Sequence, residues 1–173
     1  MNPLTIRDAT VGDSEAIWDI YAYYVENTAA TFEIETPSLS EFAGRVAAIV
    51  ADYPYFVCEQ DGAVVGYAYA SRHREREAYQ YDVDVSIYVR NGMGHSGIGT
   101  ALYEALFDAL AERDYYNVYS GITLPNEASV ALHHKFGFED IGVYRKTGFK
   151  LGAWHDVLWL DKTLKPHEDK LAQ

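Results

Sequence analysis

The sequence predicts a single α+β domain in which helices flank a mixed, mostly antiparallel central sheet. Its 173 residues match the size of one domain, and 49% apolar with 14% aromatic residues suffice for one buried core. Strand-like alternation and helix-like apolar spacing succeed one another along the chain, without an internal repeat or a Pro/Gly/Ser linker. We therefore place one domain at residues 1–165 and a polar tail at residues 166–173.

The chain is predicted to begin with one strand and two helices. "LTIRDA" alternates like a short strand, and Thr10 and Asp13 then have the spacing of a capping box before the apolar periodicity of "SEAIWDIYAYYVENT". Ser38 and Glu41 repeat this spacing before a second helical pattern in "EFAGRVAAIV".

The middle of the chain predicts an antiparallel meander of three strands. "YFVCEQDGAVVGYAYASR" contains two β-rich runs joined at Asp61-Gly62, which is a hairpin turn signal, and "YDVDVSIYV" is a third run with a period of two. Cys58 lies in the first run without a second cysteine to pair with, so we expect a buried core thiol.

A strand–helix–strand crossover and a closing pair of strands are predicted for the second half. "GTALYEALFDALAERD" is a helical pattern and "YNVYSGITL" a strand-like one. "NEASVALHHKF" is a short helix with Asn126 as the N-cap candidate and Gly137 as the residue just past its C-terminus. "FEDIGVYRKTGFK" and "WHDVLWLDKTL" are the last two strands.

Composition also limits the partners. A formal charge of −12 and a pI near 4.8 repel phosphate backbones, so neither nucleic acid nor an anionic membrane surface is an expected partner. The first residues, "MNPLTIRDATVGD", lack the basic and apolar regions of a signal peptide, and no apolar run approaches the roughly 18 residues of a membrane span. We expect a cytoplasmic protein.

Four glycines lie between the strand that ends at Val89 and the helix that follows. They are Gly92, Gly94, Gly97 and Gly99. Glycines allow successive backbone N–H groups to point inward at a helix N-terminus, where they bind a phosphate or pyrophosphate without a lysine. The alternative is a glycine-rich turn without a ligand.

Two other nucleotide-binding motifs do not fit these glycines. A dinucleotide site needs an acidic residue at the end of the next strand, which here ends in Thr123 and Leu124. A Walker A loop needs Lys and Ser/Thr where Ile98 and Gly99 stand.

"GHSGIGTAL" resembles motif A of the GNAT N-acetyltransferases, a Q/R-x-x-G-x-G/A loop that holds the pyrophosphate of acetyl-coenzyme A. Gly97 and Gly99 match the motif glycines, whereas Gly94 stands where the family usually has Gln or Arg. The resemblance implies a coenzyme site made of Gly94, His95, Ser96, Gly97, Ile98, Gly99 and Thr100.

From about Leu4 to Leu164 the chain resembles the phosphinothricin and methionine sulfone N-acetyltransferases within that superfamily. The strings "TFE", "AYQYDVDVSIYV", "ITLPNEASVALHHKFGF" and "GVYRKTGFKLGAWHDV" stand in the family's order and spacing. The resemblance implies the GNAT fold, a homodimer, and direct transfer of an acetyl group from acetyl-coenzyme A. The implied acceptor is the α-amino group of phosphinothricin, methionine sulfone or sulfoximine, or a similar small amino-acid-like substrate.

The acetyl transfer needs a group that removes a proton from the attacking amine. Asp82 and Asp84 share one face of "YDVDVSIYV", where a solvated strand face is the simpler interpretation. By resemblance, Asp84 takes the place of the family's glutamate base. Because aspartate is one methylene shorter, we expect it to act through an ordered water or with His133 on the short helix as its helper, although a lone helical histidine is often structural. No ligand spacing suggests a metal, and direct transfer needs none.

Two further groups complete the predicted coenzyme site. Asn126 is either a helix N-cap or, by resemblance, a partner of the pantetheine arm. The backbone of Ile87, Tyr88 and Val89 is expected to pair with pantetheine as an added strand would, with an N–H near the thioester oxygen.

The acceptor side is predicted from the basic island "SRHREREAY". Arg74 and Arg76 are either solvated residues with local ion pairs or, by resemblance, a grip on the substrate's carboxylate together with Tyr79. Phe32 matches a pocket aromatic of the family, while Trp154 and His155 suit either a pocket or a dimer contact.

Two rival functions stay open. A protein N-terminal acetyltransferase needs an open groove in place of a carboxylate grip. A non-catalytic acyl-coenzyme A sensor is permitted by Gly94, whereas Asp84 and His133 argue against it.

Overall fold

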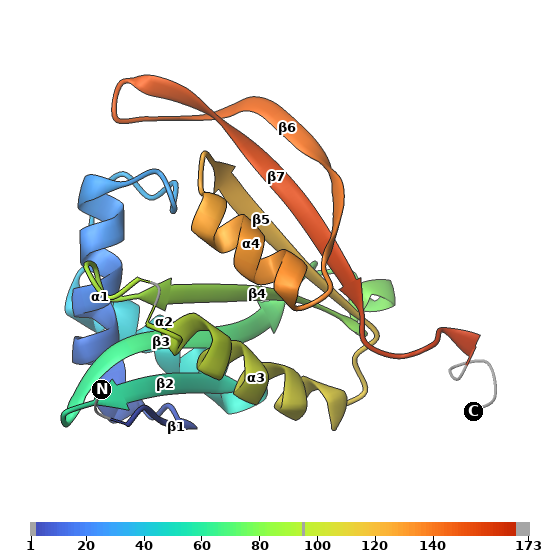
Figure 1. The fold of residues 1–173 in the computed structure, drawn as a ribbon, viewed down its shortest axis with the longest axis horizontal. Helices are drawn as coiled ribbons and strands as arrows, with labels where there is room; N and C mark the ends of the chain where they lie inside the picture. The colour runs from blue at the N-terminus through green and yellow to red at the C-terminus, as the bar shows by residue number, and fades with distance from the viewer. Residues whose placement is uncertain (1–2, 95, 169–173) are drawn as a thin grey trace.

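The computed structural model describes residues 3–94 and 96–168 and shows a seven-stranded mixed sheet with helices on both faces (Figure 1). Its strands are β1 (Thr5–Asp8), β2 (Tyr55–Gln60), β3 (Ala63–Arg72), β4 (Asp82–Val89), β5 (Asn117–Leu124), β6 (Glu139–Lys150) and β7 (Ala153–Thr163). Its helices are α1 (Ser14–Asn27), α2 (Leu39–Asp52), α3 (Ile98–Ala111) and α4 (Glu127–Lys135), with short 3-10 turns η1 (Val11–Asp13) and η2 (Glu77–Tyr79). The predicted fold class and the predicted order of strands and α-helices are confirmed. The predicted tail continues into residues 169–173, which lie outside the described residues.

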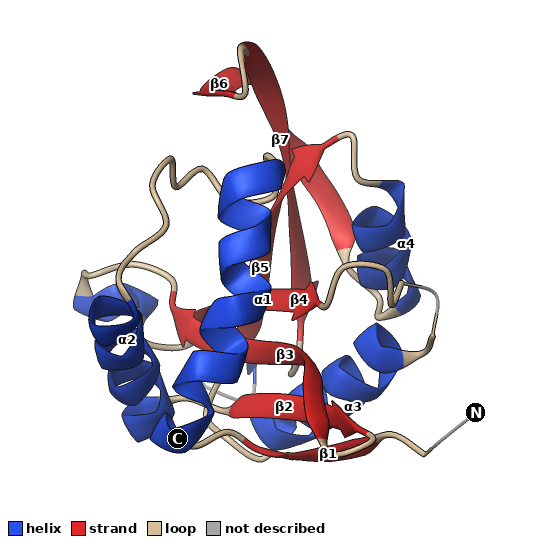
Figure 2. Cartoon of the chain, turned by 90° about the vertical axis from the view of Figure 1, so that its left-hand side faces the viewer, coloured by secondary structure: helices blue, strands red, loops and turns tan. Residues whose placement is uncertain are grey.

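The sheet order is β1-β2-β3-β4-β5-β7-β6, and every neighbouring pair is antiparallel except β4 and β5. Helices α1 and α2 cover one face, and α3 and α4 lie on the other (Figure 2). Each face has its own apolar core, one containing Ile17, Val46 and Tyr67 and the other Val85, Leu102 and Leu106. The described residues include no helix with the length and apolar character that crossing a membrane requires.

The local signals in the sequence work as predicted, with one shift. The Ser38–Glu41 capping box forms, with the Ser38 N–H donating to Glu41 at 2.9 Å. Asp61 and Gly62 have φ of 54° and 77°, as a tight hairpin turn requires. The Asp13 carboxylate accepts from the Thr10 N–H at 2.8 Å, but this pair begins η1, and α1 follows it.

Cys58 is fully buried in the core beneath α3, as predicted from its apolar run. Burial also raises the pKa of its thiol, which disfavours the reactive thiolate form. This cysteine is a packing residue.

The parallel strands β4 and β5 pair only at their first residues. Their register covers Asp82 with Asn117, Val83 with Val118 and Asp84 with Tyr119, and the two strands then diverge (Figure 1). Beyond this point β4 remains paired with β3 on its other edge as far as Val89. The edge of β4 that faces β5 is therefore left without a strand partner over its second half.

Candidate active site

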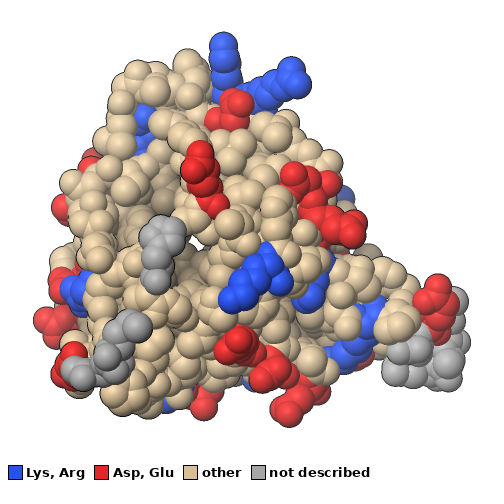
Figure 3. Space-filling model, in the orientation of Figure 1, with Lys and Arg blue, Asp and Glu red and all other residues tan. Residues whose placement is uncertain are grey.

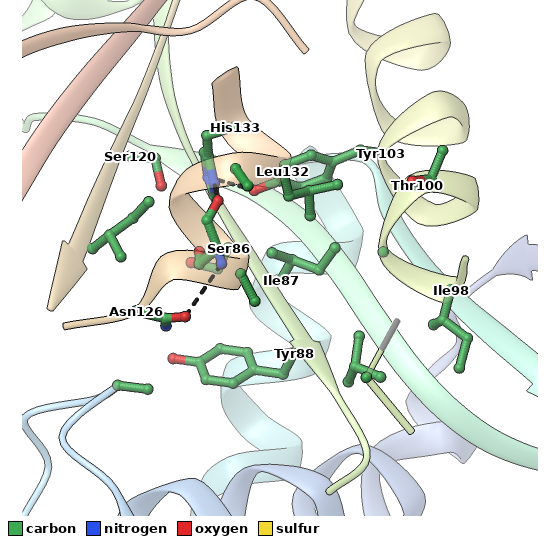
Figure 4. Close-up of a pocket in the computed structure, with 18 of the residues that line it drawn as sticks. Ser86, Ile87, Tyr88, Ile98, Thr100, Tyr103, Ser120, Asn126, Leu132 and His133 are labelled. Carbon is green, nitrogen blue, oxygen red and sulfur yellow. Dashed lines mark hydrogen bonds between the residues drawn. The ribbon is translucent and has the colours of Figure 1, made fainter. Parts of the chain in front are cut away.

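A cavity of about 470 Å³ occupies the gap between the diverging strands. Its lining includes the second half of β4, the middle of β5, the glycine loop and one face of α4 (Figure 4). The predicted coenzyme residues found in this lining are Ile87, Tyr88, Val89, Gly94, Ser96, Gly97, Ile98, Gly99, Thr100 and Asn126. His95 lies outside the described residues. The structure thus gathers the remaining predicted coenzyme residues around one cavity.

The glycine loop ends as the N-terminus of α3. Gly97 is the N-cap and has a φ of 83°, in the left-handed region that favours glycine. The Ala101 N–H donates to the Gly97 carbonyl at 3.0 Å, so the N–H groups of the first turn precede the helical ladder and lie where an anion binds. Gly94 has an ordinary φ and open space around its Cα.

Lys135 is a cationic residue of this cavity that the sequence interpretation missed. Its Nζ lies 3.0 Å from the Thr100 hydroxyl, so the last residue of α4 reaches the first turn of α3. Lys135 lines the cavity together with Gly94, which has no side chain to contribute. The cavity therefore has a positive charge close to the helix N-terminus.

Of the two roles predicted for Asn126, the structure shows the helix N-cap and leaves the pantetheine contact as a prediction. Its side-chain oxygen accepts from the Ser129 N–H at 3.2 Å, which confirms the N-cap interpretation (Figure 4). The residue also lines the cavity, so its amide nitrogen remains the group for a ligand.

His133 is buried and held by two neutral partners. Its Nδ1 lies 2.8 Å from the Ser129 carbonyl, which only accepts, so Nδ1 carries the hydrogen. Its Nε2 then accepts from the Tyr103 hydroxyl at 2.8 Å (Figure 4). Burial lowers the pKa of His133 and raises that of Tyr103, so both side chains favour their neutral forms.

Asp84 has a different histidine as its partner. His73, just past the end of β3, lies with Nδ1 2.6 Å from Asp84 Oδ1. Burial raises the pKa of Asp84, and the hydrogen bond from His73 opposes that rise. A carboxylate with a raised pKa is a stronger base than an exposed one.

Asp84 and His133 have different hydrogen-bond partners in the structure. Asp84 is opposite Ser71 in the register and shares its face of the sheet with Tyr67 and Tyr69 of β3, on the side of α1. His133 contacts Tyr103 of α3, on the opposite face. His133 as a helper of Asp84 stays a prediction, beside the ordered water that is the alternative helper.

The predicted acceptor residues lie apart from the cavity lining. Tyr79 meets the His73 ring edge-on at 5.9 Å, and the charge of Arg74 acts on the Asp84 carboxylate. Arg76 is exposed, and its carbonyl caps η2. One local ion pair of this loop joins Arg72 to Glu75, with 3.0 Å between the guanidinium nitrogen and the carboxylate oxygen.

Phe32 packs against the hairpin of β6 and β7. A Cβ atom at Gly148 would overlap the Phe32 ring, and His155 lies 6.3 Å from that ring. The Lys150 ammonium donates to the Thr31 carbonyl at 2.8 Å, which ties the same loop to the hairpin. Phe32 and His155 thus belong to one cluster.

Trp154 lies elsewhere on the hairpin, 61% exposed and 5.3 Å from the Phe149 ring. Metal ligation has no support in the described part of the chain, where no three His, Cys, Asp or Glu side chains gather in a suitable group. That the reaction needs no metal stays a prediction.

Comparison with known proteins identifies the class of enzyme to which this sheet and its glycine-rich helix N-terminus belong. Residues 6–159 match the family model described as an acetyltransferase (GNAT) domain. The chain therefore belongs to the GNAT acetyltransferases, as its motifs predicted.

Its relatives include enzymes named for small amino-acid-like substrates. A phosphinothricin N-acetyltransferase of Streptomyces coelicolor is 38% identical, over 92% of this chain and 95% of the relative. An L-methionine sulfoximine/L-methionine sulfone acetyltransferase of Salmonella typhimurium is 32% identical, over 95% and 96%. The crystal structure of a phosphinothricin acetyltransferase from Sinorhizobium meliloti in complex with acetyl-coenzyme A is 38% identical, has a TM-score of 0.90, and aligns over 95% of this chain and 94% of that one.

Proposed function

We propose that this acetyltransferase moves the acetyl group of acetyl-coenzyme A to the α-amino group of a small amino-acid-like substrate, by direct attack. The observation that carries the proposal is the cavity where β4 and β5 diverge, which joins the N-terminus of α3 to an unpaired strand edge. The predicted coenzyme residues surround it, and the relatives named above act on amino-acid analogues. Phosphinothricin, methionine sulfone and methionine sulfoximine are the first acceptors to test.

The residues of the cavity fit an acyl-coenzyme A. First-turn N–H groups of α3 and the ammonium of Lys135 suit a pyrophosphate, because both present positive charge to it. The free edge of β4 suits the amide groups of pantetheine, and the Asn126 amide faces the same cavity. The Val89 carbonyl already accepts from the Tyr24 hydroxyl at 2.6 Å, which leaves Ile87 and Tyr88 as the main backbone partners.

Asp84 is proposed to remove the proton. The acceptor's ammonium gives one proton to the carboxylate, its nitrogen lone pair forms the new N–C bond, and the C–S bond of the thioester breaks. The second proton that the nitrogen loses as the amide forms goes to the leaving thiolate by way of solvent, and Asp84 returns its proton to solvent. A backbone N–H of β4 near the thioester oxygen stabilises the charge that develops there.

Arg74, Arg76 and Tyr79 are proposed to hold the acceptor's carboxylate. Arginine binds carboxylates through two parallel hydrogen bonds, and Arg74 is close enough to Asp84 for its charge to act on that side chain. A carboxylate held here would bring the α-amino group toward Asp84. Phe32, against the β6–β7 hairpin, is the proposed apolar contact for the substrate's side chain.

A release assay distinguishes this proposal from both rivals. The protein is mixed with acetyl-coenzyme A and amino acids, sulfones, sulfoximines or an amino-terminal peptide, and free thiol is measured. Thiol release with free amino acids but not with the peptide supports the proposal. Release with the peptide alone indicates an N-terminal acetyltransferase, and binding without any release indicates a sensor.

Replacing Arg74 and Arg76 by Gln tests the carboxylate grip. We expect KM for a free amino acid to rise at least about tenfold, because two charge-assisted contacts are lost. An amine without a carboxylate should be affected much less. Equal effects on both acceptors would refute the grip.

A homodimer is proposed from the β6–β7 hairpin, which projects beyond the body of the sheet (Figures 1 and 2). It carries the exposed apolar residues Ile141, Val143, Tyr144, Phe149, Leu151 and Trp154. An apolar surface of this kind favours association. Sedimentation should give twice the 19.5 kDa chain mass, and Trp154→Glu should reduce it to one chain mass; a monomeric wild-type protein would refute the dimer.

The remaining partner predictions rest on charge. Basic side chains occur in small groups among acidic and uncharged ones on the face that Figure 3 shows. This distribution supports the absence of nucleic-acid and membrane partners, which stays a prediction together with the cytoplasmic localisation.

A further inference from the structure

The proposed base is in contact with the imidazole of His73. His73 lies in the basic island "SRHREREAY", directly before Arg74 of the predicted acceptor grip. Its ring nitrogen approaches the Asp84 carboxylate more closely than any other protein group that the structure places on this side chain, at 2.6 Å.

We propose that His73 is a positioning residue, which fixes the Asp84 carboxylate in one orientation so that its second oxygen faces the acceptor's amine. The proposal rests on the proposed function, and deepens it by adding a residue to the same site. His73 is not proposed to touch the substrate itself.

The surroundings of His73 hold its ring in one plane. The ring stacks on Tyr119 of β5, with centroids 4.2 Å apart and planes 20° apart. The Tyr79 ring contacts the His73 ring edge-on, with centroids 5.9 Å apart and planes at 70°. Only 11% of the His73 side chain is exposed, so the ring has little freedom to rotate away from Asp84.

The sheet register explains why these residues meet. Arg72 is opposite Val83, and Asp84 is opposite Tyr119. His73, the residue after β3, therefore lies beside β4 and β5 where these two strands are still paired. This is the last paired position before the strands diverge. The His73–Asp84 pair therefore lies at the start of the gap that the proposed reaction uses.

The proton transfer to Asp84 requires no proton from His73, whose Nδ1 hydrogen stays on the ring. Nδ1–H donates to Asp84 Oδ1, which leaves Oδ2 to accept the proton of the ammonium group. The charged neighbours act in opposite directions, because Arg74 stabilises the carboxylate and Asp82 disfavours it. Tyr79 and Tyr119 contribute rings that shield the pair from solvent.

Two substitutions separate a hydrogen bond from simple packing. His73→Asn keeps a side-chain N–H near the position of Nδ1, whereas His73→Phe keeps a ring for Tyr119 and removes the donor. We expect His73→Phe to lower kcat about 30-fold, in line with a lost hydrogen bond to a charged group, and His73→Asn to recover most of that loss. The dissociation constant of acetyl-coenzyme A should not change in either variant.

His134→Asn is the matched control. His134 forms the chain's other imidazole–aspartate contact that the structure describes as an ion pair, with Asp140 at 2.8 Å, but both side chains are about half exposed. The substitution His134→Asn should leave kcat within about twofold of wild type, since the contact between His134 and Asp140 lies on the surface.

A double substitution gives the decisive comparison. If His73 acts only through Asp84, His73→Phe should have little further effect on kcat in an Asp84→Asn background. Full additivity, or a His73→Asn variant as slow as His73→Phe, would overturn the proposal. If the wild-type protein acetylates no amine at all, the proposed function fails first, and that result differs from a wild-type enzyme whose His73 variants are equally fast.

Discussion

The two histidines near the gap in the sheet have opposite environments. His73 donates to a partly exposed carboxylate and lies among charged residues, with Arg74 and Asp82 acting on its partner. His133 is almost fully buried and lies between a carbonyl and a hydroxyl, both neutral. The Asp84 carboxylate beside His73 can accept a proton, whereas burial lowers the pKa of His133 and disfavours its protonation.

This difference separates the two faces of β4. On the α1 side, the residues suit proton removal from an acceptor. On the α3 side, glycines, helix N-terminus and the Tyr103–His133 pair suit a coenzyme in a fixed cavity. Substitutions on the first face should change turnover, and those on the second face should change coenzyme binding or stability.

The largest expected effect is on turnover, from Asp84→Asn. This change removes the proposed base but keeps the shape, so kcat should fall about 100-fold or more. Acetyl-coenzyme A binding, measured by calorimetry, should stay within about twofold. Asp82→Asn on the same face is the control, because its carboxylate accepts from Asn117 at 2.8 Å, outside the gap. A normal kcat for Asp84→Asn at saturating substrate would remove Asp84 from the mechanism.

Tyr103→Phe tests the opposite face through stability. The change leaves Nε2 of the buried His133 without its partner, which should lower the free energy of unfolding by about 1–3 kcal/mol. Urea denaturation measures this loss. Tyr23→Phe, at a half-buried position of α1, is the comparison for the general cost of removing a hydroxyl; equal losses would mean that the contact with His133 contributes nothing.

The sequence predicted the coenzyme face better than the acceptor face. Gly94 to Thr100 are adjacent in the chain, so one motif could place them together, and Asn126 had a local capping signal. His73 meets Asp84 only because of the β3–β4 register, and the loop between these strands is too long for its turn type to fix that register. Tyr103 and Lys135 meet residues of another helix, for which the sequence contains no spacing rule.

Lys135→Ala and Gly94→Gln should shift coenzyme binding in opposite directions. Loss of the ammonium beside Thr100 should weaken acetyl-coenzyme A binding about fivefold, since the side chain is exposed. Gly94→Gln restores the usual residue of the family motif at a position with open space and ordinary backbone, so binding should tighten a few-fold. Calorimetry measures both, and kcat should hardly change; tighter binding by the Lys135 variant would contradict the assignment.

The smallest expected effect is the pH dependence that His133 gives to stability. Burial lowers the pKa of His133 below its ordinary value of 6.5, so between the two values the unfolded chain binds a proton that the folded chain does not. The free energy of unfolding should therefore fall as the pH decreases through this window. Carboxylates with lowered pKa values change the stability only at lower pH. The hydrogen bond from Arg7, for example, lowers the pKa of Asp13 from 3.8 to about 2.

Comparing wild type with His133→Asn isolates this contribution. Asparagine keeps a donor for the Ser129 carbonyl but does not titrate, so its stability should change less between pH 7 and pH 5.5 than that of wild type. His134→Asn serves as the control for an exposed histidine one residue away. Parallel curves for wild type and His133→Asn would show that His133 is protonated as readily in the folded chain as in the unfolded one, and the contrast with His73 would then rest on geometry alone.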